Sequence, residues 1–211
     1  MVHSLADIRA ALLDTLPPRV EDDQGRVAAV AAILRAGPDD AELLFIRRAT
    51  RRGDPWSGHM AWPGGKREPN DDGLLGCAIR ETREEVGLDL RETGKLIGTL
   101  RAFRRQSAAA TTGLRAVYPF VFVLNAEPGQ ASGLGLSPGG EVQEAVWIPL
   151  SYFTQWSTRR PWRWIARSLP ATPPAYRYQG RIIWGLTQWM LADLLQRLAR
   201  HRAGEKGSGI R

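Results

Sequence analysis

The chain has 211 residues and a formal net charge of +7, with 43% hydrophobic and 24% charged residues. These values exclude a collagen-like, low-complexity or wholly disordered chain, and the length suits one domain with its own core. Charged residues interrupt the apolar positions near the start, and no apolar run approaches the ~18 residues of a membrane span. The single cysteine, Cys77, cannot form an internal disulfide. We therefore expect a cytoplasmic protein with no membrane partner.

The first predicted elements are a helix and a β-hairpin. Leucine and isoleucine residues recur at helical spacing over residues 4–16, Ser4 with Asp7 resembles a capping box, and two prolines follow. Residues 26–34 and 42–47 are typical of strands, and the Gly-Pro-Asp-Asp sequence at 37–40 predicts the turn between them.

A loop rich in glycine and proline at residues 48–69 precedes a predicted helix over residues 73–86. Further elements follow in chain order: strands over 95–103, 115–124 and 142–148, a short helix over 149–155, strands over 162–165 and 177–183, and an amphipathic helix over 186–200. The pattern predicts an α+β fold in which a mixed sheet lies between helices. We expect a single domain over residues 1–203 and a flexible tail over residues 204–211.

The positive charge comes mostly from clustered arginines, including Arg47, Arg48, Arg51 and Arg52. Such clusters bind phosphorylated small molecules, anionic lipids or nucleic acid, and they also form ordinary solvated surface. No recognisable nucleic-acid-binding motif accompanies them, so we expect no nucleic-acid partner.

Three carboxylates converge on one side of the helix over residues 73–86. At about 100° per residue, Glu81, Glu84 and Glu85 share an arc, and another arc holds Leu75, Ala78, Ile79, Thr82 and Val86 as the buried side. Close carboxylates raise one another's pKa unless a cation lies among them, and Mg²⁺ prefers oxygen ligands. Solvated helices also have such charge clusters, so the spacing alone leaves both interpretations open.

The string from residue 63 to residue 88 resembles the signature of the Nudix hydrolases, G-x5-E-x7-R-E-U-x-E-E-x-G-U, where U is aliphatic. Gly65 matches the first glycine, and residues 80–88 match the second half. Thr82 replaces an aliphatic residue. The loop acid is an aspartate, either Asp71 or Asp72, because the spacing is one residue longer than the pattern.

This resemblance implies a Nudix-type α/β/α sandwich and hydrolysis of a diphosphate linkage with Mg²⁺ or Mn²⁺ as cofactor. The implied metal ligands are the Gly65 carbonyl and the carboxylates of Glu81, Glu84 and Glu85. Arg80 would orient these carboxylates by ion pairing. The catalytic base would be Glu81 or a carboxylate outside the signature, for which Glu141 is the candidate.

The flanking residues resemble the coenzyme A diphosphatase-type members of this family. Residues 58–65 fit that subfamily's Gly-x3-Phe-Pro-Gly-Gly element, with Trp62 in place of phenylalanine, and residues 176–191 resemble its closing strand and helix. Asp54 occupies a position where the pattern expects arginine. The resemblance implies a nucleoside diphosphate-linked substrate, with coenzyme A as the first candidate. The expected substrate contacts are Arg47, Arg48, Gly64 and Trp62, although Trp62 equally suits a core position.

Two alternatives to coenzyme A hydrolysis stay open. The substrate can be another nucleoside diphosphate derivative, such as ADP-ribose, a dinucleoside polyphosphate or a nucleoside triphosphate. The chain can also be a binding module that keeps the fold without catalysis. The resemblance also implies a homodimer, because members of this family are often dimers.

Overall fold

A computed structural model provides the structure of the protein. It describes residues 2–12, 27–50, 57–104, 114–125, 136–155, 159–161 and 174–208. The strand predicted at residues 162–165 and the end of the helix predicted at residues 4–16 lie outside these ranges. Across the described residues, no helix has the length and apolarity needed to cross a membrane.

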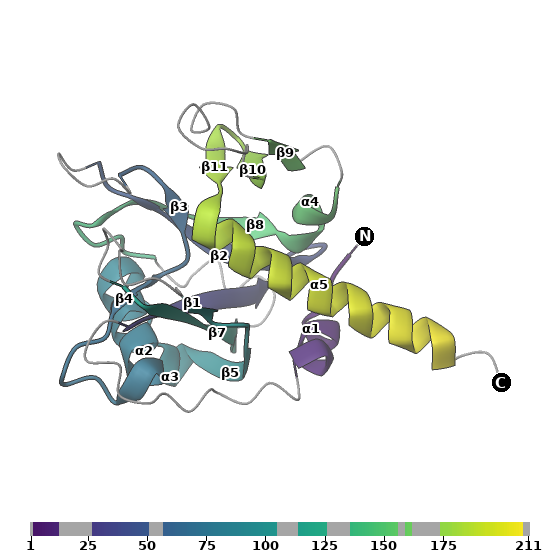
Figure 1. Cartoon of the computed structure of the whole chain (residues 1–211), viewed down its shortest axis with the longest axis horizontal. Coiled ribbons are helices and arrows are strands. Elements are labelled where there is room, and N and C mark those ends of the chain that lie inside the picture. Colours follow the sequence, from purple (N-terminus) through teal and green to yellow (C-terminus); the bar gives the residue numbers. More distant parts are fainter. Residues whose placement is uncertain are drawn as a thin grey trace.

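Groups of strands are separated by helices along the chain (Figure 1). The helices are α1 (Leu5–Leu12), α2 (Gly73–Val86), α3 (Leu90–Thr93), α4 (Leu150–Thr154) and α5 (Gly185–Ser208). The strands are β1 (Val27–Ala36), β2 (Ala41–Arg48), β3 (Met60–Ala61), β4 (Gly64–Lys66), β5 (Gly94–Thr99), β6 (Phe103–Arg104), β7 (Ala116–Leu124), β8 (Val142–Pro149), β9 (Arg159–Pro161), β10 (Pro174–Tyr178) and β11 (Arg181–Ile183).

The main sheet is mixed, as predicted. Strand β1 pairs in parallel with β7 and antiparallel with β2, and β7 pairs antiparallel with β5. The other edge of β2 pairs with β8, while the short strands β3 and β4 pair with β2 and β1 where these two diverge. Strands β9, β10 and β11 form a separate antiparallel sheet.

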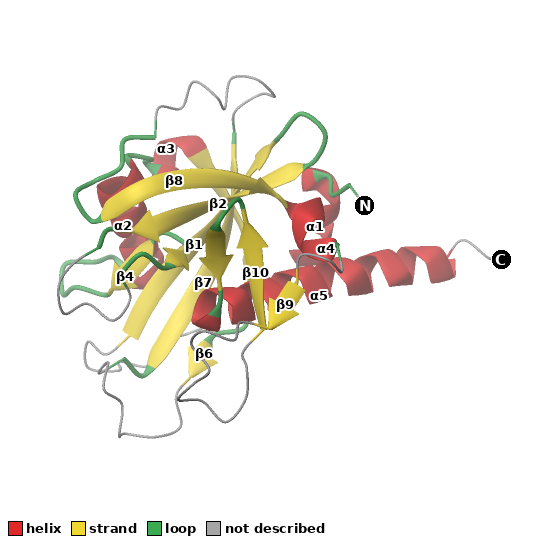
Figure 2. Cartoon of the chain, turned by 90° about the horizontal axis from the view of Figure 1, so that it is seen from above, coloured by secondary structure: helices red, strands yellow, loops and turns green. Residues whose placement is uncertain are grey.

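Helices cover both faces of the main sheet (Figure 2). Because side chains alternate along a strand, Ala29 and Ile33 of β1 pack in the core beneath α2, whereas Ala32 and Leu34 pack in the core with α1 and α5. Each face of the sheet therefore has its own apolar core. This arrangement confirms the predicted α+β sandwich.

Three predicted elements differ from the structure. The strand predicted over residues 177–183 is a hairpin, since Gln179 and Gly180 adopt φ values of 46° and 82° and turn the chain between β10 and β11. The strand predicted over residues 95–103 is divided into β5 and β6. The last helix extends beyond residue 200 to Ser208, into the stretch predicted as a tail. There Arg202 binds the carbonyl of Val2 and lies 3.5 Å from Asp7 of α1.

A buried histidine precedes α1, and we expect it to make the stability of the fold sensitive to acid. His3 is 3% exposed, and neither ring nitrogen has a hydrogen-bond partner. Burial, and next the positive charge of Arg202, lower the pKa of this imidazole, although Asp40 and Asp7 act in the opposite direction. Below pH 6.5, His3 therefore binds a proton more readily in the unfolded chain than in the folded chain. We expect the free energy of unfolding to decrease as pH falls below about 6.5, by at most about 1.4 kcal/mol per pH unit from this group.

Urea unfolding at pH 7.5 and pH 5.5 measures this dependence. The variant His3→Leu should show a shallower loss of stability between the two pH values, because its buried side chain binds no proton. Val2→Ala, at an exposed neighbouring position, serves as the control and should keep the wild-type slope. Equal slopes for wild type and His3→Leu would contradict the prediction.

Candidate active site

Helix α2 forms the centre of the site and has the bounds that the sequence predicts. Its buried side includes Ala78, Ile79 and Val86, and Gly87 ends it in the left-handed conformation at φ 76°. Thr82 is fully buried and its hydroxyl donates to the Ala78 carbonyl at 2.7 Å. The polar group that replaces an aliphatic residue is therefore satisfied within the helix.

Strand β4 brings its backbone against the carboxylates of α2. The Gly64 N–H donates to Oε2 of Glu85 at 2.8 Å. A Cβ on Gly65 would lie 2.5 Å from Cδ of Glu81, so only glycine leaves that carboxylate its present position. The glycine pair, which lies in the stretch predicted as a loop, thus belongs to a short strand whose backbone lines the carboxylate cluster.

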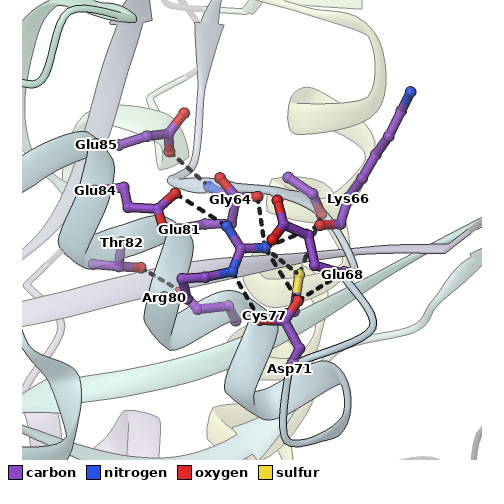
Figure 3. Close-up of polar contacts among 12 residues, drawn as sticks. Gly64, Lys66, Glu68, Asp71, Cys77, Arg80, Glu81, Thr82, Glu84 and Glu85 are labelled. Atoms are coloured by element: carbon purple, nitrogen blue, oxygen red, sulfur yellow. Dashed lines mark hydrogen bonds and ion pairs between the residues drawn. The ribbon is translucent and has the colours of Figure 1, made fainter. Parts of the chain in front are cut away.

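Arg80 holds the acidic side chains of the loop and the helix together (Figure 3). Its guanidinium makes two hydrogen bonds to Asp71, at 2.8 and 3.1 Å, and ion pairs with Glu84 at 3.0 Å and Glu81 at 3.1 Å. Asp71 is therefore the loop acid beside Arg80. Asp72 is exposed at the N-cap of α2 and makes no side-chain cap hydrogen bond.

Replacing the two loop aspartates separately tests this assignment. The Asp71 side chain is 4% exposed, and its pKa is lowered by the hydrogen bonds from Arg80. We expect Asp71→Asn to lower the free energy of unfolding by about 1–3 kcal/mol, because a buried charge-assisted pair is lost. Asp72→Asn should change it by less than about 0.5 kcal/mol. Chemical denaturation measures the free energy of unfolding of both variants. Equal losses would show that the pairing of Asp71 with Arg80 contributes no extra stability.

Burial and mutual repulsion disfavour the charged carboxylates of the site. Glu85 is 5% exposed, and burial raises its pKa to about 8 against the hydrogen bond from Gly64. Burial also raises the pKa of Glu81, which Arg80 partly offsets. Glu84 is exposed and paired with Arg80. The predicted trio thus divides into two buried or half-buried acids near β4 and one at the surface.

These residues suit a divalent cation by their chemistry more than by their present arrangement. Among the described residues, no group of three or more His, Cys, Asp or Glu side chains is arranged to hold a metal ion. The coordination set of Glu81, Glu84, Glu85 and the Gly65 carbonyl stays a prediction. The donors are nevertheless all oxygens, as Mg²⁺ and Mn²⁺ prefer, and a cation would relieve the cost of two buried carboxylates.

The loop before β8 brings Glu141 toward the end of α2. The N–H groups of Ser137 and Gly139 donate to the carbonyls of Val86 and Glu85, both at 3.0 Å. Glu141 is exposed and close enough to Glu85 to raise the pKa of that residue. The structure thus brings Glu141 near the carboxylate cluster. The contact of Gly139 with α2 was not predicted from the sequence, where the glycine pair at 139–140 is its one local signal.

The two arginines predicted as substrate contacts lie on opposite faces of β2. Phe45 packs in the core that contains α5, and Ile46 packs in the core that contains α2. Because side chains alternate along a strand, Arg47 lies on the α5 face and Arg48 on the α2 face. Arg47 pairs with Glu144 at 3.6 Å. Arg48 acts electrostatically on Glu85 and lowers the pKa of that carboxyl. Only Arg48 is therefore on the carboxylate side.

Trp62 is a core residue rather than a stacking platform. Its side chain is 1% exposed and its ring centroid lies 6.4 Å from that of Phe45. Trp62 thus occupies the core position that the sequence left open as the alternative, and its contact with a substrate stays a prediction. The large apolar ring gains more from burial than from exposure, and it fixes the chain just before Gly64.

The fold and the carboxylate helix define a class of hydrolase. The family model for the NUDIX domain matches residues 25–168, which is more than half of the chain. The chain therefore belongs to the Nudix hydrolase family.

Three curated relatives illustrate its similarities. An uncharacterised protein of Schizosaccharomyces pombe is 41% identical over 110 residues, which cover 52% of this chain and 32% of that protein. The uncharacterised Nudix hydrolase NudL of Photorhabdus laumondii is 28% identical, covering 86% of this chain and 90% of its own. The human mitochondrial coenzyme A diphosphatase NUDT8 is 30% identical, covering 74% of this chain and 63% of its own. The chain thus spans under two thirds of the first and third relatives.

Proposed function

We propose that the protein hydrolyses the diphosphate linkage of coenzyme A or its derivatives with Mg²⁺ or Mn²⁺. The observation that carries the proposal is the buried Glu85 carboxylate, held by the Gly64 N–H beside Glu81 in a chain of the Nudix family. The human relative is named as a coenzyme A diphosphatase, which supports this substrate among the diphosphates.

The positions of the residues suggest a separate role for each in this proposal. Glu81, Glu85 and the Gly65 carbonyl would hold the metal, joined by Glu84 after rotation away from Arg80. The bound metal supplies polarisation of phosphoryl oxygens and a lowered pKa for a bound water. Arg80 would orient the Glu81 carboxylate, because its guanidinium hydrogen-bonds Asp71 and forms an ion pair with Glu81. Arg48 is placed to bind a phosphoryl oxygen on the same side.

Two carboxylates are candidates for the base that removes the water's proton. Glu81 is half-buried and paired with Arg80, whereas Glu141 is exposed beside Glu85. The pH profiles of Glu81→Gln and Glu141→Gln distinguish them. The variant of the true base should lose the acidic limb of the kcat profile, and the other should keep it.

A substrate panel tests the proposed function directly. The purified protein is incubated with Mg²⁺ or Mn²⁺ and, separately, coenzyme A, ADP-ribose, NADH, a diadenosine polyphosphate and nucleoside triphosphates. We expect the highest kcat/KM with coenzyme A. A higher value for another substrate would reassign the specificity within the family. Turnover of none, with metal bound, would favour the non-catalytic binding module. Cytoplasmic location and dimer formation stay predictions.

A further inference from the structure

A small pocket lies on the face of the sheet opposite α2. Arg47, His59, Arg181 and Trp184 are among the residues that line it. Its volume is about 110 Å³, well below the ~300 Å³ of sites that bury a drug-sized ligand. The pocket therefore suits a single chemical group rather than a whole nucleotide.

The polar wall of the pocket is positively charged. Glu144 of β8 accepts two hydrogen bonds from Arg181, at 3.0 and 2.6 Å, and lies 3.6 Å from a guanidinium nitrogen of Arg47. Within the described part of the chain, one carboxylate thus faces two guanidinium groups, and these three side chains together have a net positive charge. The Arg47 side chain is 41% exposed. This charge balance favours an anionic ligand.

The arginines are held by rigid local structure. Tyr178 pairs with Arg181 across a two-residue turn in which Gln179 and Gly180 both have positive φ. Such turns match the twist of a hairpin and fix the residue that follows them. On the apolar side, the rings of His59 and Trp184 pack edge to face, with centroids 5.0 Å apart. Arg181 is therefore anchored at its backbone by the turn and at its guanidinium by Glu144, so its side chain has little freedom to lose on binding a ligand.

The pocket and the carboxylate cluster share the end of one strand. Arg47 lines the pocket, and the next residue, Arg48, acts on Glu85. The backbone joins the two sides as well, because the N–H of Arg48 donates to the carbonyl of His59 at 3.0 Å. Adjacent Cα atoms are about 3.8 Å apart. The pocket and the carboxylate cluster are therefore connected through consecutive residues at the end of β2.

We propose that Arg181, together with Arg47, binds a phosphate group that the substrate carries outside the diphosphate that is cleaved. This inference rests on the proposed function and adds a specificity-determining residue to it. Glu144 occupies Nε and Nη2 of Arg181, and Nη1 donates to the Gln179 carbonyl, so Arg181 contributes mainly positive charge. The more exposed guanidinium of Arg47 presents the paired N–H donors that match phosphate oxygens. Glu144 holds the Arg181 guanidinium in place before the ligand arrives, so the pocket is preorganised.

Coenzyme A and 3′-dephospho-coenzyme A differ only by a ribose phosphate and therefore test the pocket. We expect Arg181→Gln to lower kcat/KM for coenzyme A by roughly 10- to 100-fold, mainly through KM, as for a lost charge-assisted contact. The value for 3′-dephospho-coenzyme A should change by less than about threefold, because that substrate leaves the pocket empty. Arg181→Lys should recover part of the loss. Arg177→Gln is the matched control, since it removes an exposed arginine from the same hairpin.

An equal loss on both substrates would overturn the proposal and leave the proposed function standing. Should Arg181→Gln fail to fold, as judged by circular dichroism, Arg47→Gln replaces it with the same expectation. If the wild type does not hydrolyse coenzyme A, the proposed function fails. Isothermal titration calorimetry then tests separately whether the pocket binds a phosphate group. Adenosine 3′,5′-bisphosphate should then bind the wild type at least about tenfold more tightly than AMP does, and Arg181→Gln should abolish the difference. Equal affinities in the wild type would reject the pocket.

Discussion

Glu85→Gln is expected to reduce kcat by on the order of 10²- to 10³-fold, while the fold stays intact. Glutamine has the shape of the carboxyl, and its amide oxygen can still accept the hydrogen bond that Gly64 donates. It cannot supply the negative charge that a divalent ion needs. Kinetics with Mn²⁺ and a diphosphate substrate measure the first effect. Thermal unfolding with and without Mn²⁺ measures the second.

The thermal experiment separates a metal ligand from a structural residue. Any ion that binds only the folded state raises the Tm, so wild type should unfold at a higher temperature in Mn²⁺ than in EDTA. Glu85→Gln should lose most of that increase but keep the Tm measured in EDTA. Glu92→Gln, at an exposed position of α3, is the control and should behave as wild type. A full Mn²⁺ response in Glu85→Gln would exclude this residue as a ligand.

Alanine substitutions at the two neighbouring glycines of β4 should have opposite consequences. A Cβ on Gly64 would overlap the carbonyl oxygen of Ala29 and lie 2.6 Å from Cα of Val30, and its φ of 150° disfavours any side chain. The obstructing atoms are backbone, so we expect Gly64→Ala to cost about 3 kcal/mol or more. A Cβ on Gly65 would instead meet the end of the Glu81 side chain, which can rotate.

Gly65→Ala should therefore change the free energy of unfolding by less than about 1 kcal/mol. It should lower Mn²⁺-dependent kcat/KM by at least about tenfold, because the Glu81 carboxylate is displaced. Gly64→Ala should lower the Tm by roughly 6–12 °C. Differential scanning calorimetry and steady-state kinetics measure the two effects. A stable, active Gly64→Ala protein would show that β4 is not packed against β1 as described.

Local patterns in the sequence predicted the elements whose ends have their own signals. The bounds of α2 agree because apolar residues recur at helical spacing and Gly87 ends the helix in a left-handed conformation. The turn before β2 agrees because glycine, proline and aspartate favour turns. The hairpin at Gln179 was missed because glutamine is not a typical residue for a positive φ.

The errors in the site have causes in tertiary structure. Helical spacing places Glu85 beside Glu84, but β4 covers only Glu85, and its burial depends on that contact between distant segments. The choice between Asp71 and Asp72 depends on the path of a loop, which the spacing did not determine. The separation of Arg47 from Arg48, by contrast, follows from the alternation of side chains in a strand and was predictable.

The parallel pairing of β1 with β7 has a consequence for the integrity of the hydrolase signature. The ladder pairs residues from Val27 to Leu34 with residues from Ala116 to Val123. The whole signature lies in the sequence between these two paired strands. An excised peptide with the complete motif lacks the platform against which β4 is aligned. The motif is contiguous in sequence, yet its geometry belongs to strands that precede and follow it.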